Sequence, residues 1–383
     1  MVRRVRAGFG LRTIARQFGV SVSTVSLWVS RSAQERLDRF SFTDHRRGHA
    51  WNRIEPVMEQ RILQTRTQLR ESILGEYGAD AIERELHQEV AGVLVSRATI
   101  NRVLKRHGAT DSHIRVRRPA PPKGWYLPTV AAAQAELDCF DFIEDLKIAG
   151  GPVVNVLTAK SLHGALTDAW VLLQLSAKGS VACLLGRWRR DGLPAYAQFD
   201  NHTVFQGAHQ FADTVGRISR LSLALGVIPV FVPPLEYGMQ NTVESFNGLW
   251  QAKVWQRHHV ASVAELQVRS DAYIAAHRAR TAEARETLPS RRPVPQHFEF
   301  DPRAPLHGQM IFIRRTGESG HVHILGQRFP VSADWPHRLV RCEVDFEHHC
   351  IRCFALRRRV PAEQPLLTTI SYHRADKPFR GEL

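Results

Sequence analysis

Between residues 129 and 260 the chain alternates short apolar segments with amphipathic ones, and this alternation limits the folds it can adopt. Three predicted strands come first, in "QAELDCFDF", "PVVNVLTA" and "ALTDAWVLLQL". A helix is then predicted in "GSVACLLGRWRR", a strand in "AYAQFD", a helix in "FADTVGRISRLSLALG" and a buried strand in "VIPVFVPP". Three consecutive strands followed by alternating helices and strands predict a mixed sheet flanked by helices.

The composition indicates a basic protein of the cytosol. The 383 residues include 52 Lys and Arg against 37 Asp and Glu, for a formal net charge of +15. This excess indicates a polyanionic partner, nucleic acid first and an anionic membrane surface second. The five cysteines are an odd number spread along the chain, so they predict no disulfide framework. Because the chain shows neither a signal peptide nor an apolar run of membrane-spanning length, we expect a cytoplasmic protein.

The first organised segment, "GFGLRTIARQFGVSVSTVSLWVSR", has the spacing of a helix-turn-helix. Ala15 is small enough for two helices to cross, Gly19 permits a left-handed turn, and Val25 seats the second helix. Ser21 or Ser23 is expected to cap that second helix. The residues expected to read a major groove are then Ser23, Thr24 and Ser26. A purely structural helical hairpin is the alternative.

A second helical unit is predicted between residues 58 and 108. A helix from Asp80 carries the apolar Ile82 and Leu86, and Ser96 is expected to cap a final basic helix. Phosphate contacts are expected from four residues of that last helix, Arg97, Asn101, Arg102 and Lys105. Two such units in tandem predict a bipartite site on DNA, and a solvated basic helix face is the alternative.

Two proline-rich stretches divide the chain further. The first, within residues 111–128, predicts an extended basic linker, which either lies along a DNA backbone or acts as a passive tether. The second, "TLPSRRPVPQHFEFDPRAP", precedes alternating segments that predict a small β-barrel or sandwich, with nucleic acid or another protein as its partner. The sequence therefore predicts a multidomain chain: a helix-turn-helix unit at 1–50, a second helix-turn-helix or winged-helix-like unit at 51–110, a linker at 111–128, an α/β core at 129–286 and a small β-barrel at 300–375.

Three carboxylates from distant parts of the core are candidates for one site. Asp138 lies on the first predicted strand, and Asp200 ends the fourth, where ligands of α/β sheets gather. Glu244 lies on the helix after the fifth strand, beside its apolar stripe. Because three acids at one point repel one another, they imply a compensating cation. Oxygen ligands alone select Mg²⁺ or Mn²⁺, and two such ions suit phosphodiester chemistry. For Glu244 taken alone, a solvated surface residue is the alternative.

Three segments around these acids, "ELDC", "FDNHTVF" and "TVESFNGLW", together resemble the signature segments of the DDE integrase catalytic core. That family includes retroviral integrases and bacterial insertion-sequence transposases. The resemblance implies a ribonuclease-H-like fold at 129–286, with Asp138, Asp200 and Glu244 as the metal-binding triad. It also implies supporting roles for Asn201 and Asn247.

The segments depart from the retroviral pattern in several places. The interval between Asp200 and Glu244 is 43 residues, longer than in retroviral integrases, and helix-turn-helix units replace the N-terminal zinc-binding domain. Asp141 is a rival for the first position, and it lies on the opposite face of the same predicted strand from Asp138. Glu136 shares the face of Asp138 and is a second neighbour to consider.

The leading interpretation is a bacterial transposase or integrase that cleaves 3′ ends and transfers strands with the help of Mg²⁺ or Mn²⁺, two ions being expected. Its expected partner is double-stranded DNA, both element ends and target, bound by a homo-oligomer associated with the nucleoid. Lys253 is expected to grip DNA near the site, with a solvated lysine as the alternative. No membrane contact and no small-molecule cofactor are expected. The alternatives are a DNA-binding regulator with an inactive core and a nuclease without joining activity.

Overall fold

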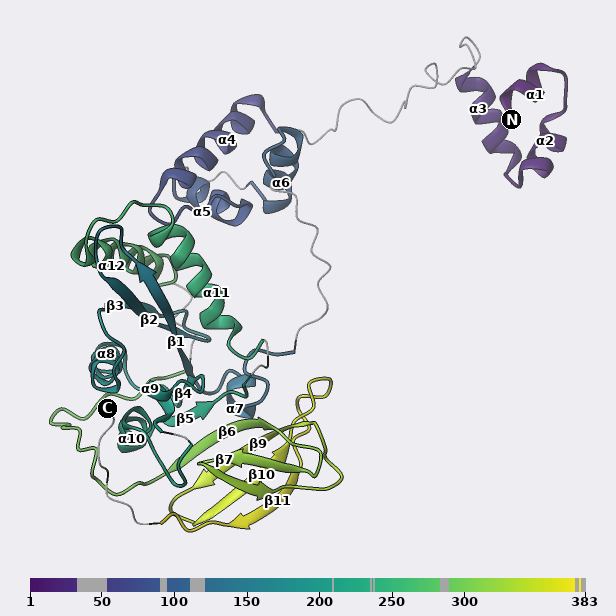
Figure 1. Ribbon diagram of the computed structural model, residues 1–383. Coiled ribbons are helices and arrows are strands. Elements are labelled where there is room, and N and C mark those ends of the chain that lie inside the picture. Colours follow the sequence, from purple (N-terminus) through teal and green to yellow (C-terminus); the bar gives the residue numbers. More distant parts are fainter. Residues whose placement is uncertain are drawn as a thin grey trace. The chain divides into compact units, whose positions relative to one another are not determined.

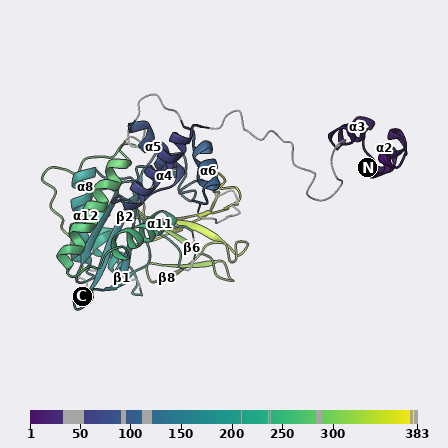
Figure 2. The same ribbon diagram turned by 90° about the horizontal axis from the view of Figure 1, so that it is seen from above.

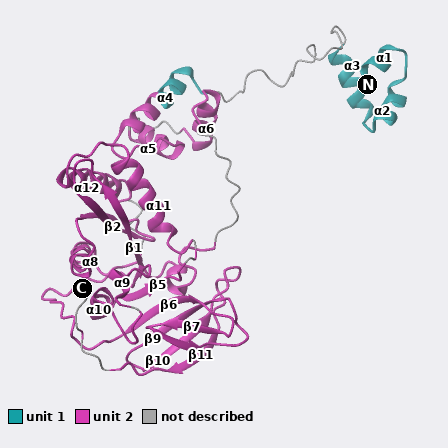
Figure 3. Cartoon of the chain, viewed as in Figure 1, with its two compact units in different colours: residues 1–63 teal, residues 64–383 magenta. Residues whose placement is uncertain are grey.

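The computed structural model describes residues 1–32, 54–89, 95–110, 121–208, 210–234, 236, 238–282, 289–375 and 379. The chain divides into two compact units, residues 1–63 and residues 64–383 (Figure 3). The first unit contains the N-terminal helices, and the second contains the sheet that carries the candidate site.

Three short helices open the first unit: α1 (Val2–Arg6), α2 (Leu11–Phe18) and α3 (Val22–Arg31). Ala15 and Val25 are buried together between them. Gly19 ends α2 with a φ of +63°, a left-handed conformation that glycine adopts without a steric penalty. Ser21 caps α3, because its Oγ accepts a hydrogen bond from the N–H of Thr24 at 3.1 Å. The predicted helix-turn-helix is therefore confirmed.

Three longer helices follow, α4 (Pro56–Glu71), α5 (Ala79–Glu89) and α6 (Arg97–Arg106). Ile82 and Leu86 of α5 are buried, as their helical spacing predicts. Ser96 caps α6 by accepting a hydrogen bond from the N–H of Thr99 at 3.4 Å. The predicted helices are present, while residues 90–94 between α5 and α6 lie outside the described residues.

The central sheet has nine strands in the order β11-β10-β9-β6-β5-β4-β1-β2-β3 (Figure 1). The first five along the chain are β1 (Leu137–Lys147), β2 (Val153–Ser161), β3 (Thr167–Leu172), β4 (Tyr196–Phe199) and β5 (Ile228–Phe231). β1, β2 and β3 pair antiparallel, whereas β4 and β5 run parallel to β1. Each of the five overlaps a predicted strand, so the predicted mixed sheet is confirmed.

The two faces of β1 are covered by different helices. Phe140 packs in one core cluster with Trp188 of α8 (Ala177–Asp191) and Leu221 of α10 (Arg217–Ala224). On the other face, α11 (Asn241–Trp250) packs against β1 and β2 (Figures 1 and 2). Because neighbouring side chains of a strand point to opposite faces, Asp138 and Asp141 face different helices.

Three more helical segments complete the second unit: α9 (Thr203–Gln206), the π-helical turn η1 (Gln251–Trp255) and α12 (Val263–Arg280). η1 continues α11 directly, and α12 packs beside β3. α12 carries several charged side chains, and in the part of the chain that is described no helix combines the length and the apolar character needed to cross a bilayer.

The C-terminal strands extend the central sheet and do not close a separate small barrel, which corrects the prediction from the sequence. β6 (Gln309–Arg315) pairs in parallel with β5, and beyond it β9 (Leu339–Asp345), β10 (Cys350–Ala355) and β11 (Leu366–Ser371) follow in antiparallel. β7 (His321–Ile324) and β8 (Gln327–Pro330) form a separate hairpin. The physical reason lies in β6, where residues 310–313 are all buried. A strand that is apolar on both faces needs cover on both, which an interior position in the large sheet supplies.

The stretch predicted as a linker, residues 111–128, is only partly described. Residues 111–120 lie outside the described residues. Residues 125–127 are buried in a core cluster with Val230 of β5 and Met239, and α7 (Pro128–Ala131) follows them. The Oη of Tyr126 donates a hydrogen bond to Oε1 of Gln198 on β4. The globular core therefore begins before residue 129.

Candidate active site

Asp141 and Asp200 lie at the same level of two neighbouring parallel strands. In the pairing of β1 with β4, Cys139 stands opposite Gln198. Two residues further along, the same register brings Asp141 opposite Asp200. Because β4 ends at Phe199, Asp200 is the first residue beyond its carboxyl end, where ligands of α/β sheets gather.

Glu244 reaches this point from α11. It lies in the first turn of that helix and its side chain is exposed, whereas Val243 and Phe246 beside it are fully buried. These apolar neighbours fix α11 against β1 and β2. Glu244 is close enough to Asp141 for its negative charge to act on that carboxyl. Glu244 is the one charged residue of α11, and it lies close to another acid of the candidate site.

The electrostatics of Asp141 reflect this crowding. Its pKa is raised to about 7, first by burial, which disfavours the charged form, and then by the charges of Asp200 and Glu244. The pKa of Asp200 is also raised by burial, although the N–H of His202 donates to its Oδ1 at 2.9 Å and favours the charged form. The charges of Asp200 and Glu244 therefore both act on the carboxyl group of Asp141.

Asn247 holds the side chain of Asp141. Its Nδ2 donates to Oδ2 of Asp141 at 2.8 Å, and this bond lowers the pKa of Asp141 against the larger effect of burial. Its Oδ1 accepts a hydrogen bond at 2.6 Å from the hydroxyl of Thr158, which pairs with Asp141 across β1 and β2. Because Asn247 follows Glu244 by three residues, one face of α11 supplies one acid and orients another.

Asn201 fixes the end of β4 against the neighbouring strands. Its Nδ2 donates to the carbonyl oxygen of Val232 at 2.7 Å, and its Oδ1 accepts from Nη2 of Arg314 at 2.8 Å. Arg314 lies on β6 and is itself buried. These bonds tie the residue after Asp200 to the ends of β5 and β6, so the backbone that presents Asp200 is held in place.

The donor set of the site is suited to a hard divalent cation. Asp141, Asp200 and Glu244 offer only carboxylate oxygens, which Mg²⁺ and Mn²⁺ prefer. Among the residues described, no three His, Cys, Asp or Glu side chains are grouped at ligand spacing. The raised pKa of Asp141 reflects burial first and then the charges of Asp200 and Glu244, and a bound cation would relieve that repulsion. The chemistry of the donors therefore fits such an ion. The ion and a proton would compete for the carboxyl group of Asp141.

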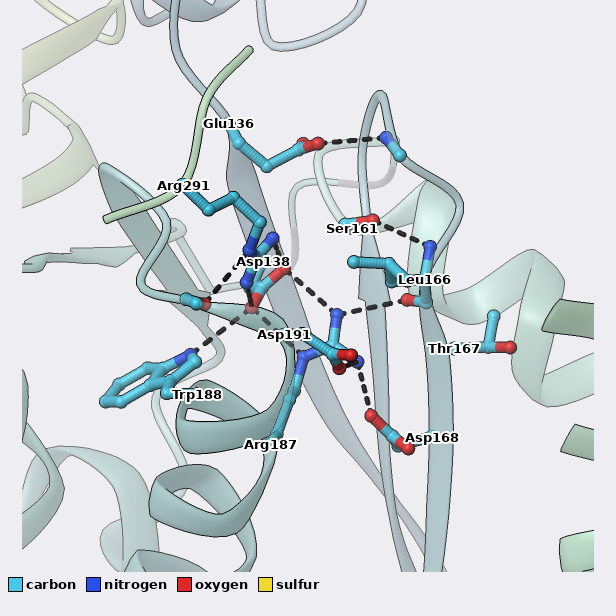
Figure 4. A network of polar contacts seen from close by, with 12 residues as sticks. Glu136, Asp138, Ser161, Leu166, Thr167, Asp168, Arg187, Trp188, Asp191 and Arg291 are labelled. Atoms are coloured by element: carbon cyan, nitrogen blue, oxygen red, sulfur yellow. Dashed lines mark hydrogen bonds and ion pairs between the residues drawn. The ribbon is translucent and has the colours of Figure 1, made fainter. Parts of the chain in front are cut away.

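Asp138, the residue predicted to be the first metal ligand, occupies a different environment (Figure 4). Its carboxylate is fully buried and accepts hydrogen bonds from Nε and Nη2 of Arg187, both at 3.0 Å. Arg291 adds two more, at 3.1 and 2.7 Å, and Nε1 of Trp188 adds a fifth at 3.3 Å. Burial alone would raise the pKa of Asp138, but the charges of Arg187 and Arg291 outweigh it and hold the pKa well below its usual value.

These contacts argue against Asp138 as a metal ligand and for Asp141 in its place. The carboxylate oxygens of Asp138 are already engaged by two guanidinium groups, and Asp138 faces α8 while Glu244 approaches from the other face. The sequence offered two aspartates three residues apart on opposite faces of one strand. It held no local signal for which face receives the helix of Glu244, because that is a tertiary arrangement.

The ion pairs around Asp138 continue into a larger network that is only partly buried. Arg187 also bonds to Asp168 of β3, which accepts from Arg190 and Arg278 as well. Arg278 of α12 and Arg190 in turn pair with Asp191, each at 2.8 Å. The network joins β1, β3, α8, α12 and the segment that carries Arg291. It therefore anchors the elements behind the candidate site.

The residues of the helical units that are predicted to contact DNA differ in their exposure and in their partners within the protein. Ser23 and Ser26 are exposed on α3, whereas Thr24 is half-buried and bonds to Ser21. On α6 three predicted residues are exposed, Asn101, Arg102 and Lys105. Arg97 is exposed too, but it pairs with Asp80 at 2.9 Å and Glu83 at 3.2 Å, so a phosphate would have to compete with two carboxylates.

Lys253, predicted to grip DNA beside the site, is bound within the protein. Its Nζ donates to the carbonyl oxygen of Gly75 at 2.8 Å and lies 5.7 Å from the ring centroid of Tyr77. Burial lowers the pKa of Lys253, and the neighbouring Arg257 adds to this effect. The nearby Arg257 donates to the carbonyl oxygens of Ser72 and Glu71 at 2.6 and 2.9 Å. Both cations thus hold the end of α4 against η1.

Comparisons with known proteins give one family match and several distant structural ones. Residues 1–40 match the model of a homeodomain-like domain. No curated protein matches the chain. Similar solved structures include the simian T-cell lymphotropic virus intasome in complex with the PP2A regulatory subunit B56 gamma, with a TM-score of 0.32, 12% identity and coverage of 72% of this chain and 91% of that one.

Two integrase catalytic core domains are similar over a shorter part of the chain. The HTLV-2 domain, solved in complex with magnesium, is 9% identical, with a TM-score of 0.28 and coverage of 36% of this chain and 81% of that one. The BIV domain is 17% identical, with a TM-score of 0.26 and coverage of 35% and 79%.

Proposed function

We propose that this chain is a metal-dependent DNA strand transferase of the integrase and transposase type, which cleaves 3′ ends and joins them to a target strand. The observation that carries the proposal is the electrostatic coupling of Asp141 to Asp200 and Glu244 at one end of the parallel strands. The sheet order β3-β2-β1-β4-β5 is the one expected of a ribonuclease-H-like core, and the resemblance of the surrounding segments to integrase signatures agrees with it.

Asp141, Asp200 and Glu244 would hold Mg²⁺ or Mn²⁺, with two ions as the expected number. When bound, such ions supply activation of a water or 3′-hydroxyl and stabilisation of the leaving oxygen of a phosphodiester. Asn247 orients Asp141 for this role through its amide, while the hydroxyl of Thr158 fixes Asn247. Because the pKa of Asp141 is about 7, its carboxyl keeps a proton over part of the neutral range, and a bound cation would compete with that proton.

DNA binding by the helical units would bring a substrate to this site. The homeodomain-like N-terminus presents α3, a helix of the kind that enters a major groove, and the chain carries a net charge of +15. The exposed residues of α6 would add phosphate contacts. Since one transfer event joins two element ends to one target, we expect a multimer on DNA.

The test is a strand-transfer assay on the DNA ends that flank the gene, with Asp141→Asn and Asp200→Asn as the variants. Each should abolish Mg²⁺-dependent cleavage and joining while leaving end binding unchanged, because each removes a ligand and no DNA contact. The matched control is Asp145→Asn, an exposed aspartate on the same strand whose φ of +57° suits asparagine. Transfer that survives in either variant would remove these residues from the site. Specific binding with no transfer by the wild type would favour the DNA-binding regulator.

A further inference from the structure

A cleft of about 700 Å³ lies between the loop before α11 and the C-terminal strands. Gly238 and Met239 line it on the side of α11, and Trp335 lines it from the turn before β9. Five arginines share this cleft, which we call the arginine cleft: Arg315, Arg338, Arg357, Arg358 and Arg359. None of the candidate site residues lines it.

Most of this positive charge is uncompensated. Arg315 pairs with Glu236, and Arg357 lies 3.5 Å from Glu363, with both members of the second pair largely exposed. Within the described part of the chain, the other three arginines have no carboxylate partner. An excess of three guanidinium groups lining a single cleft favours a polyanionic ligand, because folding alone gains nothing from repulsion between like charges.

Two of the guanidinium groups are oriented before any ligand arrives. Trp335 is buried, and its Nε1 donates to the carbonyl oxygen of Leu339 at 3.1 Å, which fixes the ring. The Cζ atoms of Arg338 and Arg357 lie 4.6 and 5.4 Å from the centroid of that ring, as cation–π contacts. Side chains that are already ordered lose less conformational entropy on binding, and the planar arginine fork matches the geometry of a phosphate.

The cleft also lies next to the helix of Glu244. Gly238, with a φ of +98°, stands three residues before the start of α11. Nη2 of Arg358 lies 3.9 Å from the point where a Cβ of residue 238 would stand. The turn after β10 that carries Arg357, Arg358 and Arg359 therefore lies close to the loop that leads into α11. Glu244 lies in the first turn of that helix. A chain of phosphates lying in the cleft could continue toward the carboxylates.

We propose that the arginine cleft binds the sugar-phosphate backbone of a DNA strand beside the active site. That the polyanion is DNA rests on the proposed function. Where it binds rests on the arginines that line the cleft. Arg358 and Arg359 contact successive phosphates, while Arg338 and Arg357 are held by Trp335. Since the contacts are to phosphate, binding there is independent of base sequence.

The test measures binding of the full chain to a short single-stranded oligonucleotide, by fluorescence anisotropy in EDTA over a series of salt concentrations. The variant Arg358→Glu/Arg359→Glu should bind about tenfold more weakly, and the slope of log affinity against log salt should fall by about 1.4, for two phosphates at about 0.7 each. The matched control, Arg303→Glu/Arg328→Glu, makes the same charge change at two exposed arginines outside the cleft and should stay within about twofold. The variant Arg358→Lys/Arg359→Lys should keep most of the salt slope, because it keeps the charge.

Equal losses in the cleft variant and its control would overturn the proposal, because they would reflect net charge and not a site. Unchanged binding by the cleft variant would overturn it as well and would point to a protein partner for this surface. The same titration with a duplex separates binding by the cleft from binding by the helical units. Because the helical units contribute to duplex binding, the cleft variant should lose a smaller fraction of its affinity for a duplex than for a single strand. The assay needs no metal, so wild-type cleft binding without strand transfer would refute the proposed function and leave the cleft proposal standing.

Discussion

Replacing Asp141 with asparagine should stabilise the second unit in metal-free buffer, although the residue is proposed to be essential for activity. The reason is that Asp141 is an acid held against two other acids and partly removed from water. Its pKa of about 7 lies far above the 3.8 of an ordinary aspartate, so the folded protein binds a proton that the unfolded chain releases. The stability that this proton provides is fully present below pH 4 and is lost as the pH rises toward 7.

The size of the effect follows from the two pKa values. A difference of this size corresponds to about 4 kcal/mol at a pH well above 7, and about 2.5 kcal/mol of it develops between pH 5 and pH 8.5. Asparagine keeps an oxygen that can accept the hydrogen bond from Asn247 but carries no charge. The free energy of unfolding of the variant should therefore exceed that of the wild type by about 1–3 kcal/mol at pH 8.5, and by less at pH 5.

Urea unfolding followed by tryptophan fluorescence measures the difference, since Trp188 and Trp250 are fully buried in the same unit. The experiment is run in EDTA at pH 5 and pH 8.5, with Asp145→Asn as the control. Addition of Mg²⁺ should then stabilise the wild type and leave the variant unchanged. A variant that is less stable than the wild type at pH 8.5, or a difference that does not grow with pH, would refute the assignment of Asp141 to a cluster of acids.

Three further predictions concern other residues of the chain. Asp138→Asn should destabilise the protein by about 3–5 kcal/mol, because it removes the buried negative charge that Arg187 and Arg291 share, and unchanged urea unfolding would contradict this. Asn247→Ala should raise the pKa of Asp141 further, since it removes a hydrogen bond to the charged form. The change is measured by NMR titration of Asp141, and an unchanged or lower pKa would speak against the contact. Gly19→Ala should destabilise the N-terminal helix-turn-helix by about 1 kcal/mol in thermal unfolding, because its φ is +63°. Gly10→Ala, at a φ of −67°, should have a smaller effect, and equal effects would contradict the backbone argument.

The elements of the core could be predicted from sequence because their signals are local. The alternation of apolar residues in β1 and β2, the amphipathic period of α8 and α10, and the caps at Ser21 and Ser96 depend on neighbours along the chain. The two aspartates of β1 could be assigned to opposite faces for the same reason. The local pattern also predicted Asp200 after β4 and Glu244 on α11 as candidate acids, and their role in metal binding stays a prediction.

The different surroundings of Asp138 and Asp141 depend on contacts that are distant in sequence. Arg187 and Arg291, which lie 49 and 153 residues away in sequence, donate hydrogen bonds to Asp138. The helix α11 packs against the opposite face of β1. The C-terminal strands follow the same principle. Their alternation is compatible with a small barrel, but the fully apolar β6 is buried on both faces only when it continues the sheet from β5. Sequence alone thus determined which residues are strands, helices and candidate acids, because hydrophobic period and capping act over a few residues. The tertiary structure decided which acids meet, because the free energy of a buried charge depends on the partners that folding brings to it.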